Sequence, residues 1–421
     1  ELRLALSELE ESLIPFGMHV VGRPTDGDER EDLIRTLASA GHGVDLSAES
    51  LAHLLSDAPV DSLMDHADFA SVPAESRKAW LQMLARTGQH LAVDHELPAL
   101  IRALDGRFIP PVGGGDLLRS PDVLPTGRNI HGFDPFKLPS RFAVDEGARQ
   151  AAQLLARHQE DGRDLPSAVA LVLWGTDNLK TEGVAISQAL ALMGAKPHLD
   201  SYGRVSGAEL ISLAELGRPR VDVVMTLSGI FRDLLPMQTH LLADAAWLAA
   251  NADESAADNP IRANALAYQA KHDCDFETAA LRVFSNAEGA YGSNVNMLID
   301  SSAWEEEGGI AEPFTWRKGH AYGRNGAVQA QNQLLTNLLG RVDLAYQNLD
   351  SVELGVTSVD HYFDTLGGIS RAIGRERQNE EVPVYIADHT GGNERVRTLA
   401  EQVALETRTR VLNPKWYESM L

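Results

Sequence analysis

The chain has 421 residues, of which 44% are apolar and 23% are charged, and these are ordinary values for a packed protein. This composition excludes a mainly disordered chain, a collagen and a coiled-coil rod. The 60 Asp and Glu residues outnumber the 37 Lys and Arg residues, and the resulting charge of −23 would repel a phosphate backbone. Nucleic acid is therefore not an expected partner.

The single cysteine, Cys274, excludes a disulfide framework and any metal site built on several thiolates. The longest clean apolar run, 168–174, is far shorter than the ~20 residues that a membrane-spanning helix needs. The first residues do not have the pattern of a signal peptide. We therefore expect a protein of a reducing compartment without a membrane span.

The first part of the chain, residues 1–105, predicts a mainly helical region. Apolar residues recur at helical spacing between Leu33 and Ala38, and Gly41 ends this pattern. Runs that are typical of strands are scarce before Arg107.

The next segment, 106–165, combines a loop that is rich in Pro and Gly with a connecting helix expected over 141–159. Pro and Gly at the density found in 107–140 prevent regular elements. A loop of this length inside a compact chain is often functional, but a plain linker between domains has the same composition. Both interpretations stay open.

The last part, 166–421, predicts an α/β domain with a doubly wound, mostly parallel sheet. Continuous apolar runs are typical of strands that are buried on both faces. Polar turns and helices follow such runs here, and this order is typical of a doubly wound fold. Strands are expected at 169–174, 221–227, 281–284 and 382–387, and helices at 182–193, 233–251 and 393–407.

Ligands of such sheets gather at the carboxyl ends of the strands, and three polar turns follow expected strands there, at 175–180, 228–233 and 388–393. Each turn is expected to open a helix, whose N-terminus is a natural anion site. Ordinary N-capping explains the same residues equally well, because side chains such as Asp177 and Ser228 are good caps.

Few motifs point to chemistry. The chain has no P-loop, no His-Glu-x-x-His and no Gly-x-Ser-x-Gly. The acidic run 305–307 is typical of a solvated face. Segment 360–364 is denser, because on a helix Asp360 and Asp364 share a face and could take protons or hold a hard cation. A capped helix with a buried tyrosine fits this segment as well.

Several strings resemble segments of the large subunits of magnesium chelatase and cobaltochelatase. They occur in family order over about residues 100–421, and together they are specific. The matching strings are Leu124-Pro125-Thr126-Gly127-Arg128-Asn129, Trp174-Gly175-Thr176-Asp177-Asn178-Leu179-Lys180-Thr181, Gly217-Arg218-Pro219-Arg220-Val221-Asp222-Val223-Val224, Ser228-Gly229-Ile230-Phe231-Arg232-Asp233, Tyr291-Gly292-Ser293-Asn294-Val295-Asn296 and Asn413-Pro414-Lys415-Trp416.

Within this magnesium chelatase H / cobaltochelatase CobN family, segments 347–351 and 359–368 resemble the porphyrin-binding H-type large chain of magnesium chelatase. The cobalt branch tends to carry Asp-Tyr-Tyr where this chain has His361-Tyr362-Phe363, whereas His320-Ala321-Tyr322-Gly323 is closer to the cobalt pattern. A subunit that inserts cobalt into a corrin ring is therefore one alternative. A non-catalytic porphyrin carrier, or a docking scaffold for the motor subunit, is another.

The resemblance implies an ATP-dependent ligase that forms nitrogen–metal bonds and inserts Mg²⁺ into protoporphyrin IX in (bacterio)chlorophyll biosynthesis. Mg²⁺ is then the substrate metal. ATP would be hydrolysed by an AAA+ motor subunit and its regulatory partner, and the missing P-loop agrees with this division of labour. The implied location is the cytoplasm, including a peripheral position at the photosynthetic membrane.

This reaction needs a base for two pyrrole protons, oxygen ligands for Mg²⁺, and an apolar cleft with cations at its rim for the propionates. For each candidate residue, loop scaffolding remains the alternative role. Asp360, His361 and Glu305 are the candidates for catalysis, with Asp360 and Glu305 also as metal ligands; Arg128, Lys180 and Arg232 are the candidates for propionate or partner contacts, and Asn294, Asn296 and Tyr362 for lining the cleft.

The large subunit of this family is much longer than 421 residues. Its Gly-, His- and Glu-rich segment, often linked to the active site, lies upstream of the matching region. We therefore expect a C-terminal portion that is inactive alone.

Overall fold

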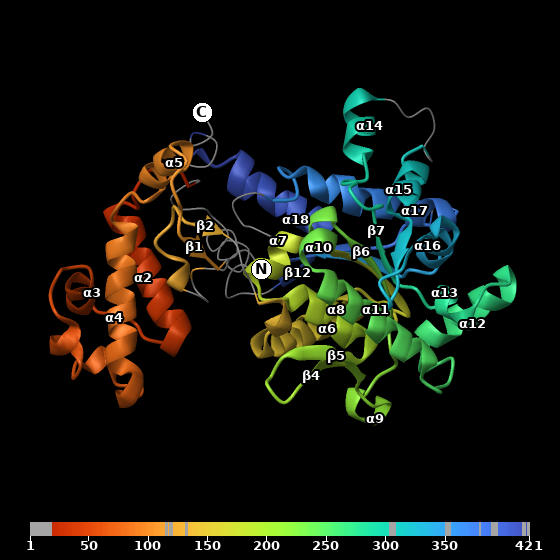
Figure 1. Ribbon diagram of the computed structural model, residues 1–421, viewed down its shortest axis with the longest axis horizontal. Coiled ribbons are helices and arrows are strands. Elements are labelled where there is room, and N and C mark those ends of the chain that lie inside the picture. The colour runs from red at the N-terminus through yellow and green to blue at the C-terminus, as the bar shows by residue number, and fades with distance from the viewer. Residues whose placement is uncertain are drawn as a thin grey trace. The chain divides into compact units, whose positions relative to one another are not determined.

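The computed structural model describes residues 19–113, 117, 121–130, 134–302, 309–349, 355–378, 380–388, 395–414 and 418. They belong to two compact units, a smaller one within Pro15–Phe133 and a larger one within Asp134–Ser419 (Figure 1). The division lies within the segment that is rich in Pro and Gly.

The smaller unit is mainly helical. Its core consists of apolar side chains from helices and short turns, among them Ile34, Leu54, Phe69 and Leu81. Its elements are α2 (Gly27–His42), α3 (Ala48–Leu54), η1 (Val60–Leu63), η2 (Ala67–Phe69), α4 (Ala74–Leu91), α5 (Glu96–Leu104), η3 (Pro121–Val123), and the short parallel pair β1 (Pro111–Val112) and β2 (Asn129–Ile130).

The larger unit is built on an eight-stranded sheet in the order β12-β11-β10-β3-β6-β7-β8-β9. The five strands from β11 to β7 are parallel, and β12, β8 and β9 pair antiparallel with their neighbours. The predicted α/β class with a mostly parallel sheet is thus confirmed. The strands are β3 (Ala168–Leu173), β6 (Asp222–Leu227), β7 (Val283–Ser285), β8 (His320–Tyr322), β9 (Val328–Ala330), β10 (Leu344–Asn348), β11 (Val384–Asp388) and β12 (Arg395–Thr398).

Helices cover both faces of this sheet (Figure 1). Because β3 and β6 are buried along their whole length, each of them needs cover on both sides. One face carries α8 (Val184–Met193), α11 (Pro236–Asn251) and, packed on α8, α6 (Arg141–Glu160); the other carries α12 (Pro260–His272), α15 (Ala311–Lys318), α16 (Asn332–Leu339) and α17 (Gly367–Glu376).

Shorter elements complete the larger unit. A hairpin of β4 (Ala195–Leu199) and β5 (Val205–Leu210) packs on α11. The remaining elements are η4 (Pro135–Lys137), α7 (Gly175–Lys180), α9 (Leu213–Leu216), α10 (Gly229–Leu234), α13 (Phe276–Ala279), α14 (Val295–Ser301), the π-helix η5 (Tyr362–Leu366), α18 (Leu399–Glu406) and the π-helix η6 (Thr407–Val411).

The helix predicted over 393–407 is wrong at its beginning. Arg395–Thr398 forms strand β12, and α18 begins only at Leu399. The reason is local: Thr398 and Glu401 form a capping box that fixes the start of the helix, and the residues before it pair with β11.

Candidate functional site

The turns after β3 and β6 meet at the carboxyl edge of the sheet. A Cβ atom on Gly175 would lie 2.9 Å from Ile230 Cγ2 and 3.0 Å from the backbone nitrogen of Phe231, so only glycine allows this approach. Ser228 caps α10 by accepting a hydrogen bond from the Phe231 N–H at 3.0 Å, as its residue type predicts. Asp177, in contrast, lies inside α7 and is not its cap.

Arg232 organises the loop that follows β7. Its Nη1 donates hydrogen bonds to the carbonyl oxygens of Ala287 at 2.7 Å and Ala290 at 3.0 Å. Its Nε donates to Asp233 at 2.7 Å, and this hydrogen bond, with another from the Tyr291 hydroxyl, lowers the pKa of Asp233. The guanidinium group also lies over the ring of Tyr291, 5.3 Å from its centroid. Most of its donors therefore hold the loop together.

A buried lysine connects β6 to the same loop. Lys318, which is 1% exposed, donates to the carbonyl oxygen of Leu227 at 3.2 Å and to Asn286 Oδ1 at 2.8 Å. Asn286 Nδ2 donates in turn to the carbonyl oxygen of Gly292 at 2.7 Å. Burial lowers the pKa of Lys318 to about 8. The sequence did not indicate this residue, because a lysine at the end of a helix is usually exposed.

Asp360 and Asp364 both contact Asn296, as expected for residues that share a face. Asp364 is buried and accepts hydrogen bonds from the backbone N–H groups of Ser293 at 2.7 Å and Asn296 at 3.1 Å. Asp360 is exposed and accepts a hydrogen bond from Asn296 Nδ2 at 3.1 Å. Asp364 therefore anchors the 293–296 segment, while the carboxylate of Asp360 is accessible to a ligand.

His361 links η5 to the sheet. Its ring lies 4.1 Å from that of Trp174, the residue directly after β3, and 4.4 Å from that of Tyr362, measured between centroids. Tyr362 is only 2% exposed, so its ring packs inside the unit. Together, Trp174, His361 and Tyr362 form an aromatic cluster beside Asp360.

The structure thus brings several predicted site residues to one edge. Asn296, Asp360, His361 and Tyr362 are joined by the contacts above, and Asn294 begins α14 beside them with a left-handed backbone (φ 63°). Arg232 reaches this group through the loop that holds Tyr291. Figure 1 shows α7, α10 and α14 at this edge of the sheet.

The other three predicted residues lie elsewhere or outside the description. Lys180 is exposed at the end of α7. Arg128 belongs to the smaller unit, where it donates hydrogen bonds to the carbonyl oxygens of Asp122, Leu124 and Pro125 at 2.6, 2.8 and 3.1 Å. Glu305 lies outside the described residues, as do residues 389–393 of the third predicted turn.

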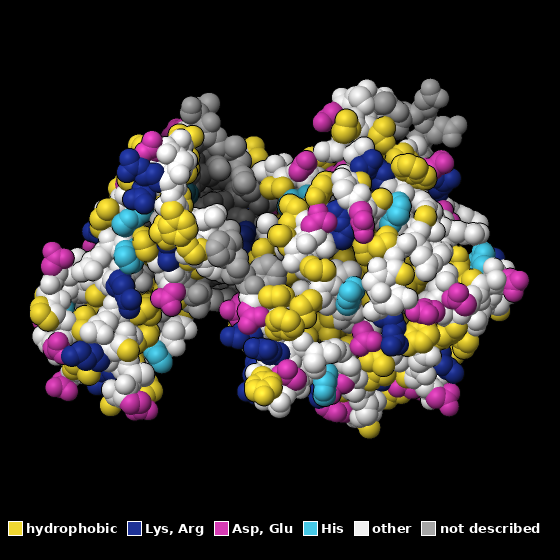
Figure 2. Space-filling view, viewed as in Figure 1, with side chains coloured by type: hydrophobic (Ala, Val, Ile, Leu, Met, Phe, Trp, Pro, Cys, Tyr) yellow, Lys and Arg dark blue, Asp and Glu magenta, His cyan; other side chains and the backbone are white. Residues whose placement is uncertain are grey.

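Apolar side chains are exposed around this edge, and hydrophobic and charged side chains mix on the visible face of the larger unit (Figure 2). Met297 on α14 is 63% exposed and Trp316 on α15 is 70% exposed. Their neighbours Ile230, Tyr291 and Phe363 are exposed as well. Clustered apolar exposure of this kind marks a surface that binds a ligand or a partner.

A cavity of about 370 Å³ lies beside Arg232. Asp233, His240, Glu288 and Tyr322 line it, and Tyr322 donates a hydrogen bond to the carbonyl oxygen of Asn286 at 2.6 Å. Within the described ranges, no three His, Cys, Asp or Glu side chains are grouped so that they could hold a metal ion. In the same ranges, no helix combines the length and the apolar character needed to cross a membrane.

The chain is similar to known proteins over its whole length. The family model described as CobN/Magnesium Chelatase matches residues 1–421. Over 99% of the chain, the magnesium-chelatase large chain of type H from Rhodobacter capsulatus is 54% identical and that from Cereibacter sphaeroides 52% identical. The chain spans 35% and 31% of these two proteins, so it corresponds to about a third of their length.

A solved structure is similar as well. The catalytic subunit of cobaltochelatase from Mycobacterium tuberculosis matches with a TM-score of 0.83 and 33% identity, over 96% of this chain and 37% of that protein. The fold described above is therefore also found in a cobaltochelatase subunit.

Proposed function

The chain belongs to the CobN/magnesium chelatase family, and on this premise we propose that it forms part of the porphyrin-binding subunit of magnesium chelatase. The whole subunit would insert Mg²⁺ into protoporphyrin IX in (bacterio)chlorophyll biosynthesis. An AAA+ motor subunit and its regulatory partner would hydrolyse the ATP. We place the reaction in the cytoplasm, with the porphyrin-binding subunit at the surface of the photosynthetic membrane.

One observation carries this proposal. The chain is 54% identical to the magnesium-chelatase protein of Rhodobacter capsulatus but 33% identical to the cobaltochelatase subunit of solved structure. Both similarities extend over nearly the whole chain, so the difference is not caused by coverage. It favours Mg²⁺ over cobalt as the substrate metal.

The edge around η5 supplies groups that this chemistry requires. Mg²⁺ prefers oxygen ligands and gives up its water slowly, so an exposed carboxylate such as Asp360 can replace a water molecule. The ring must lose two protons, and Asp360 and the adjacent His361 are suitable acceptors. We assign metal and proton handling to these two residues and to Glu305.

The tetrapyrrole is broad and apolar, and the exposed side chains of Ile230, Tyr291, Met297 and Phe363 at this edge offer a complementary surface. Asn294 and Asn296 would lie beside it. We assign propionate or partner contacts to Arg128, Lys180 and Arg232. Because Arg128 and Arg232 use most of their donors on loop carbonyls, they would act mainly by holding the loops in position.

The alternative function is insertion of cobalt into a corrin ring. It is favoured by the TM-score of 0.83 with the cobaltochelatase subunit. An assay of the full-length parent with its partner subunits would decide between the two, using Mg²⁺ with protoporphyrin IX and Co²⁺ with a corrin substrate. Faster insertion of cobalt would overturn the main proposal.

The roles of individual residues need a separate experiment. In the full-length parent, Asp360→Asn keeps an oxygen for the hydrogen bond from Asn296 but removes the charge. We expect it to lower Mg²⁺ insertion by about 100-fold while porphyrin still quenches tryptophan fluorescence. Asp253→Asn, at a fully exposed aspartate, is the matched control. Quenching without any insertion by the unmodified parent would instead indicate a carrier.

A further inference from the structure

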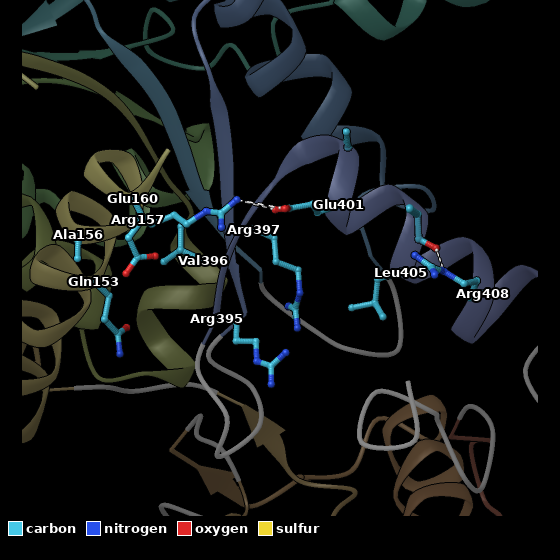
Figure 3. Close-up of a pocket in the computed structure, with 12 residues that line it drawn as sticks. Gln153, Ala156, Arg157, Glu160, Arg395, Val396, Arg397, Glu401, Leu405 and Arg408 are labelled. Carbon is cyan, nitrogen blue, oxygen red and sulfur yellow. Dashed lines mark hydrogen bonds and ion pairs between the residues drawn. The ribbon is translucent and has the colours of Figure 1, made fainter. Parts of the chain in front are cut away.

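A groove of about 800 Å³ lies between α6, β12 and α18. We call it the arginine groove, because it is lined by the four arginines Arg157, Arg395, Arg397 and Arg408 (Figure 3). These residues come from three separate elements that the fold brings together. The sheet order places β12 beyond β11 and β10, so the groove is distinct from the edge around η5.

The groove opens along the edge of β12. Arg395, Val396 and Arg397 are consecutive, so their side chains alternate between the two faces of the sheet, and yet all three line the groove. Figure 3 shows Val396 on the side of α6 and the two arginines on the side of α18. Among the described strands, β12 pairs only with β11. The opposite edge of β12 can therefore accept another strand.

The two sides of the groove differ in chemistry. On the side of α18, Arg395, Arg397 and Arg408 present guanidinium groups, which bind carboxylates in a forked geometry. On the side of α6, Val396 and Ala156 present small apolar side chains. A strand laid along β12 would meet positive charge at every second residue and apolar surface at the residues between.

The charge of the groove is opposite to that of the chain. Four arginines and two acids, Glu160 and Glu401, line it, in a chain whose overall charge is −23. Arg157 donates to Glu401 at 3.0 Å, and this ion pair bridges α6 and α18. Because Glu401 occupies the guanidinium of Arg157, an incoming carboxylate would compete with it.

We propose that the arginine groove binds an extended, acidic segment of a partner protein, which adds to the edge of β12 as a strand. Its backbone would form hydrogen bonds with β12, its acidic side chains would pair with the arginines, and its apolar side chains would contact Val396 and Ala156. A small anion would use the arginines only, whereas an alternating acidic and apolar strand uses both sides and the edge. The proposal does not depend on the metal or on the tetrapyrrole.

The test uses a fluorescein-labelled octapeptide of alternating Glu and Val, titrated with the 421-residue chain and followed by fluorescence anisotropy. We expect saturable binding that the double variant Arg395→Gln/Arg408→Gln weakens at least tenfold. Both arginines are exposed, so the variant should keep the melting temperature of the parent chain. Arg102→Gln, in the smaller unit, is the matched control and should leave binding unchanged.

Two further arms separate strand addition from simple charge attraction. An octapeptide N-methylated at alternate residues keeps its charge but cannot pair with β12, so we expect its affinity to fall at least tenfold. Glu401→Gln, which removes the competing carboxylate, should raise the affinity for the unmodified peptide about threefold.

Three results would overturn the proposal. The first is equal binding of the methylated peptide together with full competition by pyrophosphate, which would leave only an anion site. The second is no binding of the Glu-Val peptide. The third is self-association of the chain in light scattering that the double arginine variant abolishes, because the groove would then be occupied by a second copy.

Discussion

The indole of Trp174 stacks against the imidazole of His361, with ring centroids 4.1 Å apart and planes inclined by 35°. Trp174 is the first residue after β3, and His361 directly precedes η5. The stack therefore fixes His361 relative to the sheet. A candidate proton acceptor is held in this way by an aromatic contact as well as by its own backbone.

Substitution of His361 should separate packing from chemistry. His361→Phe keeps a ring against Trp174, while His361→Ala removes it and should lower the free energy of unfolding by a further ~0.5–1.5 kcal/mol in urea titrations. If His361 handles protons, both variants should lower Mg²⁺ insertion by the full-length parent about 100-fold. Activity that survives in the Phe variant alone would mean that His361 only packs.

Glu406 holds the segment that leads into η5. Its buried carboxylate accepts hydrogen bonds from the N–H groups of Val356 at 3.0 Å and Thr357 at 2.9 Å and from Gln402 at 2.8 Å, and it pairs with Arg410 at 3.0 Å. Burial raises the pKa of Glu406, but the charge of Arg410 and these hydrogen bonds outweigh it, and the pKa lies below its ordinary value of 4.5.

At pH 7, Glu406→Gln should therefore lower the free energy of unfolding by about 3–5 kcal/mol, because Arg410 loses its partner. A carboxyl with a lowered pKa stabilises the fold above its ordinary pKa, and this stability is lost as the pH falls through the folded value. The difference between parent and variant should accordingly shrink below pH 4.5 in urea titrations. Glu401→Gln, at an exposed position, is the control, and equal losses in both variants would contradict the role of Glu406.

Lys318 predicts a change of stability at alkaline pH. Its pKa is about 8 in the folded chain and about 10.5 in the unfolded chain. Between these values the unfolded chain binds a proton that the folded chain does not, so the free energy of unfolding rises with pH, by about 3 kcal/mol in total. Urea titrations from pH 7 to pH 10 should show this rise relative to Lys318→Met. A constant difference between the two proteins would rule it out.

Gln347 is buried at the end of β10, and neither its Oε1 nor its Nε2 has a hydrogen-bond partner among the described residues. Replacing it by Leu should raise the free energy of unfolding by about 1–3 kcal/mol, because an unpaired polar group leaves the interior. Gln238 is equally buried but donates to the carbonyl oxygens of Pro135 at 2.7 Å and Leu138 at 2.9 Å. Gln238→Leu should destabilise the chain, and the same sign for both variants would refute this explanation.

The sequence predicted those parts of the fold that local pattern determines. Strands β3 and β6 were predicted nearly to the residue because each is a run of six buried residues. Strand β10 was missed because its second half is Gln347-Asn348, and amides are not typical of a buried strand. Strand β12 was taken for the start of a helix because its pairing with β11 is a tertiary interaction that the sequence does not display.

The candidate site divides in the same way. The spacing of Asp360 and Asp364 predicted a shared face, and both do contact Asn296. The π-helical turn and the anchoring role of Asp364 depend on the 293–296 segment, which lies far away in the sequence. Lys318 was missed for a related reason, because only the folded chain shows that its amine is buried.

The position of β10 has a consequence for synthesis of the protein. Strand β3 lies between β6 and β10, and Val169 pairs with Leu344. A nascent chain that emerges from the ribosome therefore displays β3 with one apolar edge open until residues 344–348 follow. Unpaired edges of this kind promote aggregation. Products truncated before residue 344 should accumulate as chaperone-bound or insoluble material, so the late strand acts as the closing step that makes the domain independent of its chaperones.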